Sequence, residues 1–221
     1  MSAEAVTLAI DASTYTGTVA VLRGTRLLAD GAVAMRGEKE ERLMPAVAAA
    51  LASAGIAVDA VNRVVCGGGP GSFTSLRIAA SIAKGIATVR GIPLLAVPSL
   101  ALIVAGQESP LAAGRYLATL DAMRGDVYAA LIAVGGDGRV TPESEPMLLP
   151  ASDVAGLAAR EGASPVGPGQ PRVAWPHARG AARLEASLVA VSLREWEPSY
   201  GRLAEAQVKW EAAHGRALPR A

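Results

Sequence analysis

Apolar residues in the first part of the chain occur in short runs separated by turn residues. Residues 7–10, 19–22 and 27–33 read as strands, and residues 23–26 read as the hairpin turn between the second and the third. Short strands joined by tight turns pair with their sequence neighbours. The pattern therefore predicts an antiparallel meander at the start of a sheet.

After the meander, the spacing of apolar residues predicts helices and strands that alternate along the chain. The expected elements are a helix at 39–54, a strand at 61–66, a helix at 73–89, a strand at 94–97 and a short helix at 99–105 that Ser99 caps. Gly55 suits the end of the first helix, whereas Pro45 should kink that helix or restart it near its first turn. This order predicts an α/β fold with a mixed sheet covered by helices.

The second half of the chain begins after a turn-rich linker at residues 106–110. Strands are expected at 116–120 and 127–134, with a hairpin signal after the second. The last expected elements are a short helix at 152–159, a loop rich in Gly and Pro at 161–180 and a final helix at 203–214.

A glycine-rich turn joins the strand at 61–66 to the helix at 73–89, and its centre is Gly69, Pro70, Gly71 and Ser72. Such a turn before a helix often holds a phosphate group. The spacing fits neither G-x-x-x-x-G-K-[ST] nor G-x-G-x-x-G. Two interpretations stay open with similar weight: a tight structural turn, or a contact with an anion or a partner.

Polar residues also follow the first strand, where Asp11, Ser13 and Thr14 precede the second. Their carboxylate and hydroxyl groups suit a phosphate or a metal-bound water. They equally suit an ordinary turn, because Asp, Ser and Thr side chains often bond the local backbone.

Charge and composition narrow the function classes. The 221 residues include 21 basic and 20 acidic ones, and this balance argues against a large nucleic-acid footprint. The single cysteine, Cys66, lies in an apolar run and is expected to be a buried, inert thiol. The first residues lack the pattern of a signal peptide, and the longest apolar run, at 93–105, is too short for a membrane span. We expect a cytoplasmic protein without membrane contact.

The polar and glycine-rich motifs coincide with further segments in one known pattern. These are Asp-Ala-Ser-Thr at 11–14, Gly-Pro-Gly-Ser-Phe-Thr-Ser-Leu-Arg at 69–77, Val-Pro-Ser-Leu at 97–100, Leu-Asp-Ala-Met-Arg-Gly-Asp-Val-Tyr at 120–128 and Pro-Ser-Tyr-Gly-Arg at 198–202. With them the chain resembles the TsaB (YeaZ) family over almost its whole length. The family often has Gly at the position of Ser75, and many members have His-Ser before Glu-Arg-Leu, where this chain has Lys39 and Glu40.

The resemblance implies an actin/Hsp70-like fold in two lobes. The first lobe would comprise residues 1–106 joined by the C-terminal helix at 203–214, and the smaller second lobe residues 111–197. It also implies a partner protein that does not itself catalyse and needs no cofactor. Such a protein supports the catalytic TsaD-type protein, together with a TsaE-type ATPase, in the threonylcarbamoyladenosine modification of tRNA. Contact with tRNA would be indirect, through the complex, and a homodimer is an alternative assembly when the chain is alone.

Chemistry read from the residues agrees with a partner role. His177 and His214 are far apart and have no metal-ligand spacing, so no metal site is expected. Residues 121–126 contain one glycine and an arginine where a second phosphate loop would need a glycine run. An ATP-dependent enzyme that uses Asp11 to orient a water is the alternative function. A glycoprotease-like enzyme is a weaker one, because the metal ligands are missing.

The two helices beside the glycine turn are the candidate partner surface. On the first helix, Leu43, Met44, Val47 and Leu51 form a stripe that suits the core, and Ala46, Ala49, Ala50 and Ser53 are expected on the opposite face. On the second, the apolar arc that includes Ile78, Ile82 and Ile86 is wider than one sheet contact needs. The plainer alternative is that alanine is a good helix former and simply faces water.

Overall fold

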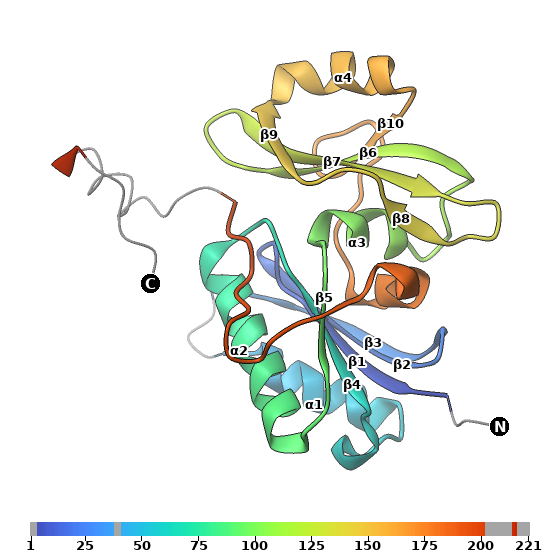
Figure 1. The fold of residues 1–221 in the computed structure, drawn as a ribbon, viewed down its shortest axis with the longest axis vertical. Coiled ribbons are helices and arrows are strands. Elements are labelled where there is room, and N and C mark those ends of the chain that lie inside the picture. The colour runs from blue at the N-terminus through green and yellow to red at the C-terminus, as the bar shows by residue number, and fades with distance from the viewer. Residues whose placement is uncertain (1–3, 38–40, 202–213, 216–221) are drawn as a thin grey trace.

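The computed structural model describes residues 4–37, 41–201 and 214–215, and it arranges them around two sheets (Figure 1). The first sheet has the strand order β11-β5-β4-β1-β2-β3. The first three strands form the antiparallel meander that the sequence predicts, and β4 and β5 run parallel to β1. The strands of this sheet are β1 (Val6–Asp11), β2 (Thr16–Arg23), β3 (Arg26–Ala34), β4 (Arg63–Gly67), β5 (Leu94–Val97) and β11 (Val189–Ala190).

Helices α1 (Leu43–Ser53) and α2 (Phe73–Arg90) cover one face of the first sheet (Figure 1). The first helix begins later than expected, so Pro45 lies in its first turn, where its missing N–H costs nothing. Glu41 lies just before this helix and accepts hydrogen bonds from the N–H groups of Leu43 and Met44. Gly55 follows the helix with a φ of 64°, as the sequence predicts.

The second sheet has the order β10-β6-β7-β8, and β9 pairs with β7. Its outer face packs on α4 (Val154–Glu161) through an apolar cluster of its own. The strands are β6 (Gly114–Asp121), β7 (Asp126–Val134), β8 (Val140–Pro142), β9 (Met147–Pro150) and β10 (Ser164–Val166). The sequence predicted β6, β7 and the helix, which here follows the 3₁₀ turn η2 (Ala151–Asp153).

Helix α3 (Ser99–Ala105) lies between the two sheets, and each of its seven residues is at most 1% exposed. Its side chains belong to one apolar cluster that contains Ala9 and Leu22 of the first sheet and Leu120 and Ile132 of the second. The two lobes therefore share a continuous core. The expected capping role of Ser99 is wrong, because Pro98 occupies the cap position and the Ser99 hydroxyl bonds elsewhere.

The chain returns to the first lobe earlier than expected. The 3₁₀ segment η3 (Ala178–Arg183) packs against β2, β11 pairs with β5, and Trp196 joins the core beneath α2. Parts of residues 178–197, expected in the second lobe, thus contact the first, while η4 contacts β8 of the second sheet. The sequence does not predict very short elements, because they contain too few residues for a periodic pattern. These elements are the 3₁₀ turns η1 (Val58–Ala60), η3 and η4 (Glu185–Ser187) and the two-residue strand β11.

The helix expected at 203–214 lies outside the described residues, except for His214. In the part of the chain that the structure describes, no helix combines the length and the apolar character that a membrane crossing requires.

Candidate functional site

The glycine turn between β4 and α2 is held by hydrogen bonds from within the protein. The Gly68 N–H donates to the Val97 carbonyl (2.8 Å), and the Ser72 N–H donates to the Ser13 carbonyl (2.8 Å). The Gly69 N–H donates to the Ser99 hydroxyl (3.0 Å). These three donors are not available to a phosphate, so the turn acts as a structural joint.

The glycines of this turn allow three backbone segments to meet closely. A Cβ on Gly71 would lie 2.0 Å from the Ser13 carbonyl oxygen, and one on Gly69, whose φ is 83°, would lie 2.1 Å from that of Ser199. Ser72 occupies the cap position of α2. Its hydroxyl lies 3.0 Å from that of Ser75 and bonds no backbone N–H.

Asp11 lies behind the turn, with an exposed fraction of 0%. One carboxylate oxygen accepts hydrogen bonds from the N–H (3.1 Å) and hydroxyl (2.8 Å) of Ser13, and the other accepts from the Ser99 hydroxyl (2.6 Å). Burial raises the pKa of Asp11, and the hydrogen bonds from Ser99 and Ser13 oppose that rise. An Asp that orients water for attack needs an oxygen open to the reaction site, and Asp11 has none. The Asp11-dependent enzyme is therefore not supported.

The other polar residues of this loop also bond locally. The Thr14 hydroxyl accepts from the Thr16 N–H (3.1 Å) and lies 3.1 Å from the Thr16 carbonyl. The sequence left two interpretations open for this loop, a phosphate or metal-bound water site and an ordinary turn. The hydrogen bonds of Asp11, Ser13 and Thr14 favour the ordinary turn. Sequence reasoning missed Ser99 as their partner, because only the fold brings the start of α3 next to the end of β1. Burial raises the pKa of the Cys66 thiol on the neighbouring strand, in agreement with an inert cysteine.

A cleft of about 750 Å³ opens between the two lobes beside this joint. It is lined by the loop after β1, the start of α2, the β6–β7 loop and five single residues, Tyr128, Leu148, Pro168, Trp175 and Tyr200. Several of its large apolar side chains are exposed, among them Tyr15 (44%), Met123 (58%) and Trp175 (54%). The sequence pointed to Met123 only as part of the segment at 120–128, and it did not single out Tyr15 or Trp175, since isolated aromatic residues in loops carry no pattern.

The β6–β7 loop has an unusual backbone. Met123 and Arg124 have φ values of 63° and 60°, a region that residues other than glycine rarely adopt. The Asp121 carboxylate holds the loop by accepting a hydrogen bond from the Met123 N–H (2.8 Å). The loop brings Arg124 to the lining of the cleft.

The candidate partner surface on α1 and α2 is open in part. Ala49 and Ser53 are exposed, and Ala46, Ile78, Ile82 and Ile86 are partly buried against the core. Ala50 is only 3% exposed and belongs to the core, so its assignment to this surface was wrong. Met44, expected in the core stripe, is 46% exposed, because the buried stripe of α1 follows the helical spacing of Leu43, Val47, Ala50 and Leu51 and leaves Met44 outside it. A second cavity, of about 450 Å³, lies along the same face of α2 and is lined by Phe73, Arg77, Ile78 and Ile82 among others.

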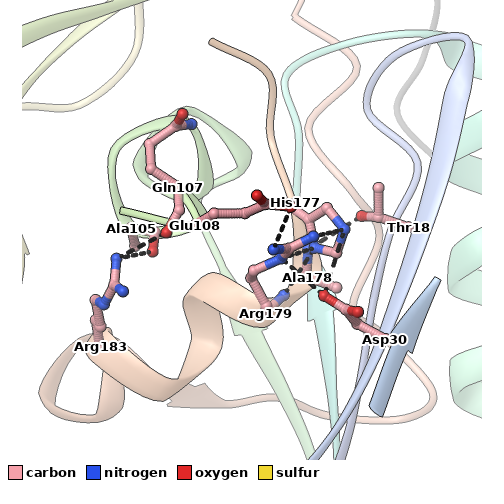
Figure 2. A network of polar contacts seen from close by, with 9 residues as sticks. All are labelled: Thr18, Asp30, Ala105, Gln107, Glu108, His177, Ala178, Arg179 and Arg183. Carbon is pink, nitrogen blue, oxygen red and sulfur yellow. Dashed lines mark hydrogen bonds and ion pairs between the residues drawn. The ribbon is translucent and has the colours of Figure 1, made fainter. Parts of the chain in front are cut away.

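A separate polar network ties the returning segment to the first lobe (Figure 2). Arg179 lies between carboxylates, with Asp30 at 2.8 Å and Glu108 at 3.1 Å. His177 Nδ1 accepts a hydrogen bond from the Arg179 N–H (3.2 Å), and the Ala178 N–H donates to the Thr18 hydroxyl (3.0 Å). This histidine has a packing role, and in the residues that the structure describes no group of three metal-ligating side chains occurs.

The network predicts a pH-dependent stability. Burial, and next the Arg179 charge, lower the pKa of His177 from 6.5 to about 4. Between these values the unfolded chain binds a proton that the folded chain does not, so stability falls as the pH drops from 6.5 towards 4. Because the ring is partly open to solvent, we expect a loss of about 1–2 kcal/mol.

Unfolding by urea across this pH range measures the effect. His177→Asn keeps an acceptor for the Arg179 N–H and does not titrate, so its stability should vary less with pH than that of the wild type. Parallel curves for the two proteins would exclude His177 as the source.

The chain matches known proteins over most of its length. A family model described as "TsaD: tRNA N6-adenosine threonylcarbamoyltransferase" matches residues 35–174, more than half of the chain. The chain is 36% identical over 129 residues to the tRNA threonylcarbamoyladenosine biosynthesis protein TsaB of Bacillus subtilis, and 35% identical over 123 residues to the TsaB of Escherichia coli. Each match covers 56% of this chain and 53% of the relative, so the chain matches about half the length of these curated relatives.

Two solved structures from Pseudomonas aeruginosa share the fold of both lobes. One is an uncharacterized protein with similarity to peptidase YEAZ, with a TM-score of 0.76 and 29% identity, covering 90% of this chain and 100% of that one. The other is YeaZ, with a TM-score of 0.74 and 27% identity, covering 89% of this chain and 99% of that one. The expected actin/Hsp70-like fold is thereby confirmed.

Proposed function

Because the chain belongs to the TsaD family, and within it to the TsaB (YeaZ) proteins, we propose that it is a non-catalytic subunit in tRNA threonylcarbamoyladenosine biosynthesis. In this proposal it binds a TsaD-type catalytic protein through α1 and α2. A TsaE-type ATPase joins the assembly, and tRNA is the substrate of the whole complex.

The observation that carries the non-catalytic role is the enclosure of Asp11. Its carboxylate is fully buried and bonded to Ser13 and Ser99, and the N–H groups of Gly68, Gly69 and Ser72 are bonded inside the protein. A phosphate-transferring site of this fold needs these groups open to the ligand. Here they hold the loop after β1, the glycine turn and α3 together.

The partner role is supported by the outer face of α1 and α2. Small exposed residues such as Ala49 and Ser53 allow another helix to approach closely, and the partly buried isoleucines of α2 supply apolar area beside them. The same face suits a homodimer when the chain is alone, since one apolar surface can serve either partner.

We expect the isolated protein to form no modified adenosine, because the groups that would stabilise the transferred carbamoyl are not open to a ligand. The purified chain is incubated with tRNA and threonylcarbamoyl adenylate, and nucleosides are identified by mass spectrometry. Parallel reactions contain a TsaD-type protein with and without this chain. Modification should require the TsaD-type protein and increase when the chain is added. Modification by the chain alone would show that it is an enzyme.

A further inference from the structure

Aromatic side chains that do not belong to the apolar core line the cleft between the lobes. Tyr15, Phe73, Trp175 and Tyr200 reach it from separate segments of the chain. Trp175 is 54% exposed, and the Phe73 and Tyr200 rings form a tilted pair with centroids 4.6 Å apart. Aromatic groups that gather in a concave site and remain exposed are typical of ligand binding.

Arginine side chains accompany these rings. The Arg36 guanidinium lies 3.9 Å from the centre of the Tyr15 ring, and that of Arg77 lies 5.1 Å from the centre of Phe73. Arg124 lines the cleft itself, and within the described ranges it has no ion-pair partner. Proteins that bind unpaired nucleotides combine aromatic rings with arginine side chains. The rings stack on the bases, and the guanidinium groups bind the phosphates.

The other residues that line the cleft restrict which chemical groups a ligand can have there. The glycine turn cannot cradle a triphosphate, because its N–H groups are bonded internally. Among the described residues that line this cleft, Arg124 is the one with a positively charged side chain, so it is the group that we expect to pair with a phosphate there. Asp121 at the end of β6 and Asp126 at the start of β7 also line the cleft, and carboxylate oxygens suit the amino group of a base such as adenine or cytosine.

We propose that the cleft binds one unpaired nucleotide of an RNA strand, with the base against Trp175 and the phosphate at Arg124. One nucleotide needs no large basic surface, so the near-zero net charge of the chain agrees with it. The inference rests on the proposed function only in taking the strand to be tRNA. The left-handed backbone at Met123 and Arg124 fits a loop that is held in a strained shape to position a side chain.

Fluorescence anisotropy of a labelled, short single-stranded RNA rich in adenosine tests the inference on the full chain. Trp175→Ala should weaken binding about tenfold, as the loss of one base stack does. Arg124→Ala should weaken binding and reduce the slope of log K against log salt by about one, as the loss of one phosphate contact does.

Two matched variants serve as controls. Val173→Ala removes an exposed apolar side chain near Trp175, and Arg139→Ala removes an exposed arginine at the β7–β8 turn. Both should bind RNA as the wild type does. Circular dichroism checks the fold of all four variants.

Three results would overturn the inference. These are no binding of the single strand, equal losses in the cleft and control variants, or AMP or duplex RNA binding as tightly as the single strand. Association with the TsaD-type protein is measured in parallel, and Trp175→Ala should retain it. A wild-type chain that associates with the TsaD-type protein but binds no RNA would overturn this inference alone, whereas a wild-type chain that binds RNA without associating would overturn the proposed partner role.

Discussion

Gly71→Ala is expected to destabilise the protein by about 3 kcal/mol, because the new methyl group meets backbone that is fixed in place. The added Cβ would lie 2.0 Å from the Ser13 carbonyl oxygen and 2.7 Å from its carbonyl carbon. That carbonyl accepts the hydrogen bond from the Ser72 N–H, so relieving the clash breaks the bond between the two loops. For a chain of this length the melting temperature should fall by about 6–12 °C.

Gly85→Ala provides the matched control for this variant. Gly85 lies inside α2, and a Cβ there meets nothing within 4 Å. Alanine favours a helix over glycine by about 1 kcal/mol, so this substitution should stabilise the protein. Differential scanning calorimetry compares the two variants with the wild type. A Gly71→Ala protein that melts with the wild type would show that the glycine turn is not a packed joint.

The sequence predicted most of the first lobe correctly because its elements have strong periodic patterns. The meander, the alternation after it and the boundaries of β5 and α3 are where the apolar runs place them. The segment after residue 176 could not be predicted in this way. Its contacts depend on single residues, such as the partly buried Trp196 against the core and Ser199 against the glycine turn, and no periodic pattern in the sequence predicts these contacts.

The candidate sites were predictable to different degrees. The glycine turn and Asp11 stood out by composition, but the sequence could not decide between a phosphate loop and a joint. That decision depends on Ser99, which lies 88 residues from Asp11 in the chain. The inter-lobe cleft was not predicted at all, because its lining comes from loops that the fold alone brings together. Ala50 was assigned to the wrong face although it lies seven residues, about two helical turns, after Leu43 and therefore on the same buried face as Leu43 and Val47.

Ala49→Glu is expected to leave the protein folded and to abolish its complex with a TsaD-type partner. Ala49 is exposed in the middle of α1, and Glu is a good helix former, so the fold should tolerate the change. In the proposed interface the new carboxylate would be buried against small and apolar residues without a partner for its charge. Such burial costs about 3 kcal/mol or more, which corresponds to an affinity loss of over a hundredfold.

The control for Ala49→Glu is the same substitution at Ala155, an exposed alanine on α4 of the second lobe. Both variants add one negative charge to a helix surface, so any general effect of charge on association is shared. Circular dichroism and thermal melting establish that each is folded, and gel filtration with the TsaD-type protein measures the complex. Only Ala49→Glu should elute separately from the partner. If it co-elutes as the wild type does, the exposed face of α1 does not bind the partner; if Ala155→Glu also fails, charge alone weakens the complex.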